Sequence, residues 1–425
     1  MKKYLASFGR LLTVEKNPWE AAAILAIVLA ALLSFISISA TQGFLALALI
    51  FLIVLLIQKR RRLAFPAFFW PLLVFAGLSL VSSFLSVNPG MSLMDSKDLL
   101  LFLIVPLVYT TIVQKEELRL VVNAVLVSSL ASSLYSLYGY FFLAYPGERV
   151  KGFMGHYMTQ AGLLLLFGSL ALGTIFFGRG KMRLVWGAGL GLAAAALVMT
   201  LTRSGWIGLA AGLCLIVLLW RPKALILVPL LAGLVFIVSP QTVKKRALSI
   251  FSLRGASNRE RVQYFNAGMK IIRDFPLFGT GPDTVDMVFQ NPKYGLGDSA
   301  KRNVHLHNNF LQIAAERGIV ALAAWAAFIV WAFSQLGRIV KNRTNKKSRP
   351  DPLAAGALAA LAAFVVAGFF EYNFGDSEVV TLLLLIVTLP FVPRARSRNS
   401  LGPSPGTCES LSEPAPGLPP RLTPE

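Results

Sequence analysis

The sequence predicts an all-α polytopic membrane protein, and three observations carry that prediction. Hydrophobic residues make up 56% of the 425-residue chain, and charged residues only 14%. The hydrophobic residues form long runs that charged residues rarely interrupt. A membrane-spanning helix needs about 20 mostly apolar residues, and about twelve runs approach that length. These runs centre near 20–39, 42–57, 67–86, 98–113, 120–144, 159–177, 184–201, 205–220, 223–239, 310–336, 353–370 and 376–392.

The distribution of lysine and arginine predicts the orientation of these spans. Cytoplasmic loops carry an excess of basic residues. If the N-terminus is cytoplasmic, basic segments such as Lys59–Arg62, Arg338–Arg349 and the tail from Arg394 all fall on the cytoplasmic side. The short outer loops then carry few basic residues. We therefore expect about twelve spans with both termini in the cytoplasm.

Three segments follow from this topology. Residues 1–18 form a cytoplasmic N-terminus, and residues 19–393 form one membrane domain that includes a long outer loop, 240–306. Residues 394–425, rich in Pro, Ser and Gly, form a disordered cytoplasmic tail. The net charge of +21 is explained mainly by inner loops beside anionic lipid, so the expected partners are membrane lipids and not nucleic acid.

The loop 240–306 contains amphipathic helices. From Arg259 to Asp274, apolar residues recur at steps of three and four, which predicts one apolar helix face made of Val262, Phe265, Met269 and Ile272. This helix is expected to lie at the membrane surface with that face toward lipid or the bundle. The glycine-rich stretch 279–282 then predicts a compact turn. Because topology does not account for the loop's basic charge, the loop is a candidate site for an anionic ligand.

A histidine segment closes this loop. The chain has three histidines, and two of them, His305 and His307, lie here beside Asn308 at the start of the tenth predicted span. An imidazole can accept a proton from a hydroxyl near neutral pH, so His307 is a candidate general base. The alternative is a histidine that only anchors a helix end. A metal site is not expected, because two imidazoles at i and i+2 share a side only on an extended segment and no acidic cluster is adjacent.

Two groups of arginines are candidates for binding a phosphate. Arg203 interrupts an otherwise apolar stretch, and a guanidinium facing lipid would cost several kcal/mol, so it must lie at a turn or face a wet cavity. Arg259 and Arg261 lie near the start of the amphipathic helix, where backbone N–H groups favour anions. A guanidinium can bind phosphate through two hydrogen bonds. The alternative for each arginine is contact with lipid headgroups.

Two weaker sets complete the candidates. Arg149 and His156 lie in the outer loop before the sixth span, where a solvated loop is the favoured interpretation and an accessory anion contact is the alternative. Glu371, Asp376 and Glu378 make the last outer turn acidic. We expect these carboxylates to be solvated, since their spacing does not support a role in orienting His307.

Four of these segments resemble the O-antigen ligase/polymerase family of bacterial membrane glycosyltransferases. The similar segments are Leu201–Gly205, the stretch from Arg261 to Gly281, His307 and Asn308 followed by Gly318, and the loop Gly152–His156. The histidine pattern is the most specific of them. The second glycine of the ligase pattern is absent, because Ala321 and Leu322 follow Val320.

The resemblance implies a glycosyltransferase that needs no metal or other cofactor and works at the periplasmic face of the bacterial inner membrane. Its donor would be a glycan on undecaprenyl pyrophosphate. His307 would be the essential histidine, Arg203 the span-junction arginine, and Arg261, or Arg259 two positions earlier, the loop arginine. The acceptor would be the lipid A-core in a ligase. A growing glycan chain (polymerase) and a protein (oligosaccharyltransferase) remain alternatives.

A lipid-linked sugar transporter or flippase is the alternative from another class, and a non-catalytic scaffold is a third. Transporters place ionisable residues or broken helices near the middle of the bilayer. Here the predicted span cores are nearly free of charge, and the polar candidates all map to one face. This distribution favours an enzyme that works at the membrane surface.

Overall fold

A computed structural model describes residues 17–143, 148–250, 256–298, 300–342 and 349–392. Within these residues every regular element is helical and no strand occurs. The all-α class is therefore confirmed. The predicted tail 394–425, and all of the predicted N-terminus except its last two residues, lie outside the described residues.

The helices follow the apolar runs closely. Those of the first half of the chain are α2 (Pro18–Leu33), α3 (Ile38–Ile57), α4 (Phe69–Phe84), α5 (Pro89–Asp95), η1 (Ser96–Leu103), α6 (Ile104–Thr111), α7 (Lys115–Tyr138), η2 (Gly139–Leu143), α8 (Tyr157–Phe177), α9 (Met182–Met199) and α10 (Arg203–Trp220). Those of the second half are η3 (Pro222–Ile226), α11 (Leu227–Val238), α12 (Gln241–Leu248), α13 (Ala256–Asp274), α14 (Val285–Val288), η4 (Pro292–Tyr294), η5 (Ala300–Arg302), α15 (Asn309–Lys341), α16 (Pro352–Ala367), α17 (Ser377–Thr388) and η6 (Leu389–Phe391).

Six of the described helices are long and apolar enough to cross a membrane: α3, α7, α8, α9, α10 and α15. Other apolar helices, such as α2, α4, α16 and α17, have 10–17 residues. The predicted run 98–113 does not form one continuous α-helix. Its first part is the 3-10 helix η1, and α6 contributes eight residues more. The count of twelve spans therefore stays a prediction.

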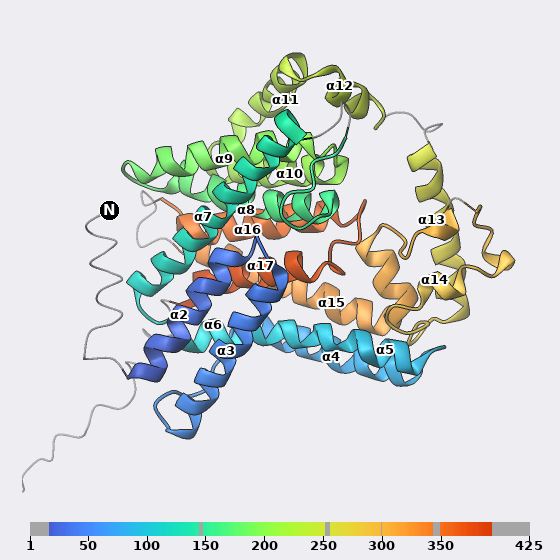
Figure 1. Ribbon diagram of the computed structural model, residues 1–425, viewed down its shortest axis with the longest axis horizontal. Coiled ribbons are helices and arrows are strands. Elements are labelled where there is room, and N and C mark those ends of the chain that lie inside the picture. The colour runs from blue at the N-terminus through green and yellow to red at the C-terminus, as the bar shows by residue number, and fades with distance from the viewer. Residues whose placement is uncertain (1–16, 144–147, 251–255, 299, 343–348, 393–425) are drawn as a thin grey trace, which may run out of the picture.

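The centre of the bundle is formed by α8 and α16, which pack against each other and against α10. Small residues allow this close approach. A side chain at Gly173 would overlap the backbone of α16, and one at Gly356 would overlap the backbone of α8 at Leu170. Close packing of small residues is a main source of helix association in membranes. In Figure 1 α8 and α16 lie near the middle of the molecule, between α9 and α10 above and α4 and α15 below.

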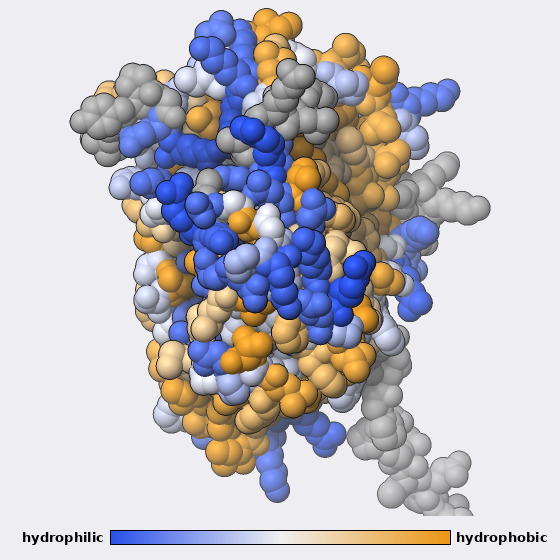
Figure 2. Space-filling model, turned by 90° about the vertical axis from the view of Figure 1, so that its right-hand side faces the viewer, coloured by the Kyte–Doolittle hydropathy of each residue, from blue (hydrophilic) through white to orange (hydrophobic). Residues whose placement is uncertain are grey.

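The described residues of the loop, 240–250, 256–298 and 300–306, form a cap, and the part of the cap from α13 onward has a hydrophobic core of its own. Side chains of α13, α14 and the short helices after them pack on the start of α15; they include Tyr264, Ile271, Val285, Phe289 and Leu311. In Figure 1 α13 and α14 lie at one end of the molecule. Figure 2 looks onto that end and shows hydrophilic residues gathered over it, flanked by hydrophobic surface.

The predicted apolar face of the amphipathic helix is not the face that packs on the bundle, and its contact with lipid stays a prediction. In α13 the buried face is made of Tyr264, Ala267 and Ile271, whereas Val262, Phe265 and Met269 are about half exposed. The helix therefore packs on the bundle through the face next to the predicted one. The physical reason is the close contact of Gly268 with Leu311, where no side chain could fit. This packing leaves Val262 and Phe265 available to line a pocket.

A sharp kink in α15 joins the cap to the bundle. Gly318 has a positive φ of 80° and interrupts the helical geometry of α15. The predicted turn around Gly279–Pro282 packs into this kink, where the Thr280 and Gly281 amides donate to the carbonyls of Ala315 and Glu316 at 2.9 and 2.8 Å. A β-carbon at Gly318 would collide with the Leu277 carbonyl. Gly318, the glycine of the histidine pattern, therefore has a structural role.

Candidate active site

Arg203, Arg261 and His307 line one pocket of about 380 Å³ between the cap and the bundle. We call it the basic pocket. Its remaining walls are mainly apolar and come from four segments of the chain; they include Ile207, Ile250, Val262, Phe265, Leu311, Phe369 and Phe370. The three candidate residues lie far apart in the sequence, so their meeting is a result of the tertiary fold.

Arg203 enters this pocket from the first residue of α10 and is 6% exposed. Its guanidinium donates to the Ser249 carbonyl at 2.9 Å and to Asn258 Oδ1 at 2.8 Å. The preceding turn is tight, because Leu201 has a positive φ of 52°. The side chain is thus held in place by two parts of the cap, in a location shielded from lipid.

Arg261 reaches the pocket from α13. One of its terminal nitrogens donates to the Phe370 carbonyl at 3.0 Å, and its Nε is buried without a hydrogen-bond partner. Burial lowers the pKa of the Arg261 guanidinium, and the nearby Glu371 carboxylate opposes that shift. A buried donor without a partner is costly, so an anion in the pocket would gain strong hydrogen bonds here.

His307 lies in a short turn that is bonded tightly to the segment after α16. Its φ is +52°, which is uncommon for a residue with a side chain. Asn308 caps α15 by accepting from the Leu311 amide at 2.9 Å and donates to the Phe369 carbonyl at 3.0 Å. The Asn309 amide donates to the Gly368 carbonyl at 2.7 Å. These bonds hold the imidazole in a conformation that the turn alone would not favour.

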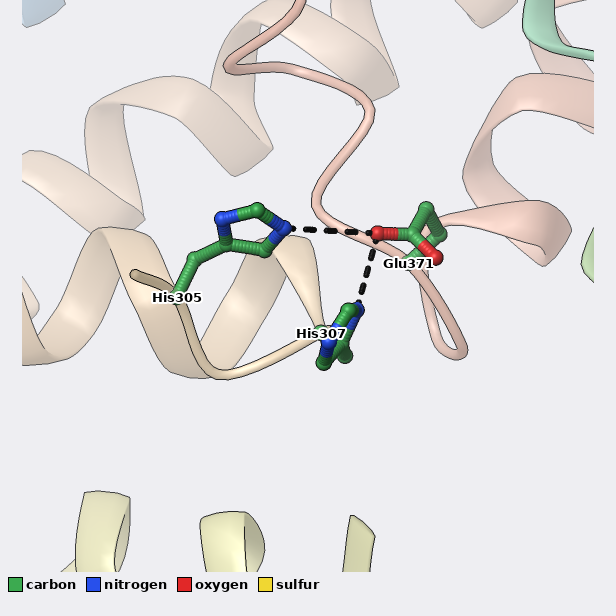
Figure 3. Close-up of side chains that lie close together, drawn as sticks. All are labelled: His305, His307 and Glu371. Carbon is green, nitrogen blue, oxygen red and sulfur yellow. Dashed lines mark hydrogen bonds and ion pairs between the residues drawn. The ribbon is translucent and has the colours of Figure 1, made fainter. Parts of the chain in front are cut away.

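Glu371 is the partner of His307. Its Oε1 lies 3.0 Å from His307 Nδ1 and 3.7 Å from His305 Nε2, as Figure 3 shows. Burial opposes ionisation of this carboxyl, but the hydrogen bonds from the two histidines outweigh burial and hold the pKa of Glu371 well below its usual range. In the tautomer with the proton on Nδ1, His307 Nδ1–H donates a hydrogen bond to the Glu371 carboxylate, and the lone pair is on Nε2. A carboxylate that is bonded to one ring nitrogen of an imidazole, with the other ring nitrogen able to accept a proton, is the arrangement of a general base.

A second pocket, of about 230 Å³, lies beside His305. We call it the acidic pocket, because five carboxyl groups line it: Asp95, Asp98, Asp283, Glu316 and Asp376. Arg317 is also part of its wall and is paired with Glu316 at 2.9 Å and with Asp95 at 3.4 Å. Aromatic side chains, including Phe75 and Tyr372, complete it. We call His305, His307 and Glu371 the histidine cluster. The basic pocket lies on its His307 side, and the acidic pocket lies on its His305 side.

The other predicted site residues do not all lie at the same pocket. Asn308 lines the basic pocket, and His305 lines the acidic one. Arg259 is exposed and does not line either pocket, so of the two loop arginines only Arg261 takes part in the described site.

Arg149 and His156 lie outside both pockets as well. The Arg149 guanidinium stacks 4.2 Å above the Tyr157 ring, and His156 Nδ1 lies 3.3 Å from Thr159 Oγ1. Arg149 is close enough to act electrostatically on Arg203 and Arg261. An accessory effect on an anion in the basic pocket remains a prediction.

The expectation that Glu371 is solvated was wrong. It is 6% exposed and bonded to His307. Glu371 and His307 are separated by 64 positions, so no local pattern connects them. The sequence feature that could have pointed to Glu371 is the position of this single acid directly after an apolar run. Asp376 was also expected to be solvated but lines the acidic pocket. The other acids of that pocket were not predicted, because the five come from four separate segments.

The described residues form an all-α protein with six helices long and apolar enough to cross a membrane, and two arginines and a carboxylate-bonded histidine meet between its cap and its bundle. Residues 188–326 match the model of a family described as O-antigen ligase. This match covers less than half of the chain and supports the resemblance to the O-antigen ligase family, which implies an enzyme of the membrane glycosyltransferase type. The matched segment contains Arg203, Arg261 and His307, whereas Glu371 lies beyond it. No curated protein matches the chain.

Proposed function

We propose that this protein transfers a glycan from undecaprenyl pyrophosphate to an acceptor hydroxyl at the periplasmic face of the bacterial inner membrane, with both termini in the cytoplasm. The observation that carries the proposal is the basic pocket, where two arginines and a carboxylate-bonded histidine meet. A transporter is less well supported, because these groups gather at one end of the molecule beside the cap.

The donor diphosphate would bind between Arg203 and Arg261. The Arg203 guanidinium is held by Asn258 of the cap and the Arg261 guanidinium by the Phe370 carbonyl, and Arg261 has a buried N–H without a partner. The apolar walls of the pocket, among them Ile207 and Phe265, suit the start of a polyprenyl chain. As the glycosidic bond breaks, negative charge grows on the diphosphate, and fixed cations stabilise that charge most where water is excluded.

His307 would act as the general base. Its Nε2 takes the proton from the acceptor hydroxyl, and the oxygen attacks the anomeric carbon of the donor sugar from the side opposite the diphosphate. The bond from that carbon to the diphosphate oxygen breaks, and its electron pair leaves with the diphosphate. The transfer therefore inverts the anomeric configuration, and it needs no metal. Glu371 positions the imidazole and stabilises the imidazolium that forms.

The acceptor would approach from the acidic pocket. Carboxylates repel a diphosphate but accept hydrogen bonds from sugar hydroxyls, and the aromatic side chains Phe75 and Tyr372 offer apolar surfaces for sugar rings. His305 stands between this pocket and His307, with the two rings 4.8 Å apart. We favour the lipid A-core as acceptor, which makes the protein a ligase. The polymerase and protein oligosaccharyltransferase reactions use the same chemistry with another acceptor.

The test is transfer by purified protein in lipid nanodiscs. The protein receives an undecaprenyl-pyrophosphate glycan together with lipid A-core, with a second glycan or with an acceptor protein, and products are identified by mass spectrometry. Product with lipid A-core alone supports the ligase, whereas product with another acceptor reassigns the reaction within the family. Donor that crosses the bilayer without any product would support the flippase instead.

A further inference from the structure

The cluster of His305, His307 and Glu371 has the donor atoms of a transition-metal site. His305 Nε2, His307 Nδ1 and a Glu371 oxygen all lie within 4.8 Å of one another, and Figure 3 shows both rings directed at the carboxylate. Two imidazoles and one carboxylate form a known zinc ligand set with an open fourth position. Bonds of about 2.0–2.2 Å place tetrahedral ligand atoms roughly 3.3 Å apart. The separations of 3.0 and 3.7 Å lie on either side of that value.

The ligands are held before any ion binds. The turn that carries both histidines is bonded to the segment after α16 through Asn308, and the Leu306 amide between the two rings donates to Gln312 Oε1 at 2.7 Å. Glu371 Oε2 is buried and has no hydrogen-bond partner. A buried carboxylate oxygen without a partner is costly, and a cation would satisfy it.

The acidic pocket offers a route for a cation. His305 lines that pocket together with Asp95, Asp98, Asp283 and Asp376, whereas Arg203 and Arg261 line the pocket on the His307 side. Carboxylates around a narrow cavity concentrate cations, and arginines repel them. An ion would therefore reach the histidines from the acidic side.

We propose that His305, His307 and Glu371 bind a divalent transition metal of the Zn²⁺ type, and that the bound metal inhibits transfer. Imidazole ligands favour such an ion over Mg²⁺ or Ca²⁺. The metal replaces the Nδ1 proton of His307 and is coordinated by the Glu371 carboxylate. Its charge makes Nε2 a weaker base, and the ion stands between the acceptor pocket and His307. The inhibition rests on the proposed function, but the binding does not.

Binding is tested by isothermal titration of chelator-stripped, full-length protein in nanodiscs with Zn²⁺ and, separately, Mg²⁺. We expect one Zn²⁺ per chain, at least tenfold weaker binding in His305→Ala and Glu371→Gln, and weak binding of Mg²⁺. His156→Ala is the matched control, because His156 is the remaining histidine of the chain and lies outside the cluster. Each variant is checked by gel filtration, and His305→Asn replaces any alanine variant that does not fold.

A second measurement reports on the ligands directly. Co²⁺ in place of Zn²⁺ gives intense visible absorption in a four-coordinate site, and this absorption is expected in the wild type and in His156→Ala but not in His305→Ala. Equal Zn²⁺ binding by the wild type and His305→Ala, or no binding by the wild type, would overturn the site.

The inhibition is tested separately from the binding, by measuring transfer with and without bound metal. We expect transfer by metal-free protein to fall at least tenfold when the site is filled and to return with a chelator. Binding without loss of transfer would overturn the inhibition and leave the site. Absence of transfer by the metal-free protein with every acceptor would count against the proposed function, whereas the binding results would stand.

Discussion

The basic and acidic pockets lie on two sides of one histidine cluster. They differ in the charge of the side chains that line them and in the chain segments that supply those side chains. The basic pocket places two arginines among apolar side chains, while the acidic pocket places five carboxyl groups and one paired arginine beside aromatic rings. The difference shows how one site can separate two substrates. A diphosphate is attracted by one pocket and repelled by the other, and His307 lines the first while His305 lines the second. Each prediction below tests this division.

The largest effect is expected for His307→Ala, which removes the imidazole that lies between the two pockets. Transfer should fall by about 10²–10⁴-fold, the usual contribution of a general base. Donor binding should change little, since the arginines remain. Initial rates and donor affinity, measured on the same nanodisc preparation, separate the two effects. Transfer within a few fold of the wild type would remove His307 from the mechanism.

Glu371→Gln is expected to lower the rate constant by about 10²-fold, less than His307→Ala, because the base remains but is no longer held in one tautomer. The loss should fall on kcat with little change in KM for either substrate, and the pH dependence of kcat should shift. A purely structural role would instead reduce the yield of folded protein and leave the pH profile of the survivors unchanged.

Glu371 should also make stability depend on pH. Its folded-state pKa lies below the unfolded value, so the stabilisation is present above pH of about 4.5 and is lost as the pH falls through the folded value. The wild type should therefore be more resistant to heat than Glu371→Gln at pH 7, and the difference should shrink at pH 4. Thermal unfolding in nanodiscs at both pH values measures this. A difference that grows toward low pH would contradict the ionised carboxylate.

The two arginines of α13 offer a matched pair for the basic pocket. Arg261→Ala should weaken donor binding by roughly 10-fold to 150-fold, the equivalent of one charge-assisted contact of about 1.5–3 kcal/mol. Arg259→Ala, two positions earlier and exposed, should cause little change. Donor titration of both variants decides between them. Equal losses would indicate that α13 contributes only general positive charge.

The smallest effect is expected in the acidic pocket. Asp283 has a positive φ of 56°, a conformation that asparagine tolerates well, so Asp283→Asn tests the carboxylate with little strain. We expect KM for the acceptor to rise by about 2-fold to 10-fold, and KM for the donor to stay constant. A change confined to the donor would break the assignment of the two pockets.

The match between the sequence predictions and the fold is closest where the chain is periodic or apolar. The apolar runs predicted the helices, the three- and four-residue spacing predicted α13, and the glycine-rich stretch predicted the turn beside Gly318. These features depend on the residues within one or two turns of helix. The face that α13 buries could not be predicted in this way, because it depends on the fit of Gly268 against Leu311.

The sequence by itself determined which residue types are available for chemistry: two histidines separated by one residue, an arginine at a span junction and an arginine on an amphipathic helix. Only the tertiary structure decided how they meet. It chose Arg261 over Arg259, brought Glu371 to His307 across 64 positions, and collected acids from separate segments into one cavity. The reason is physical. A helix or a turn depends on neighbours in the chain, whereas a pocket depends on how distant surfaces pack.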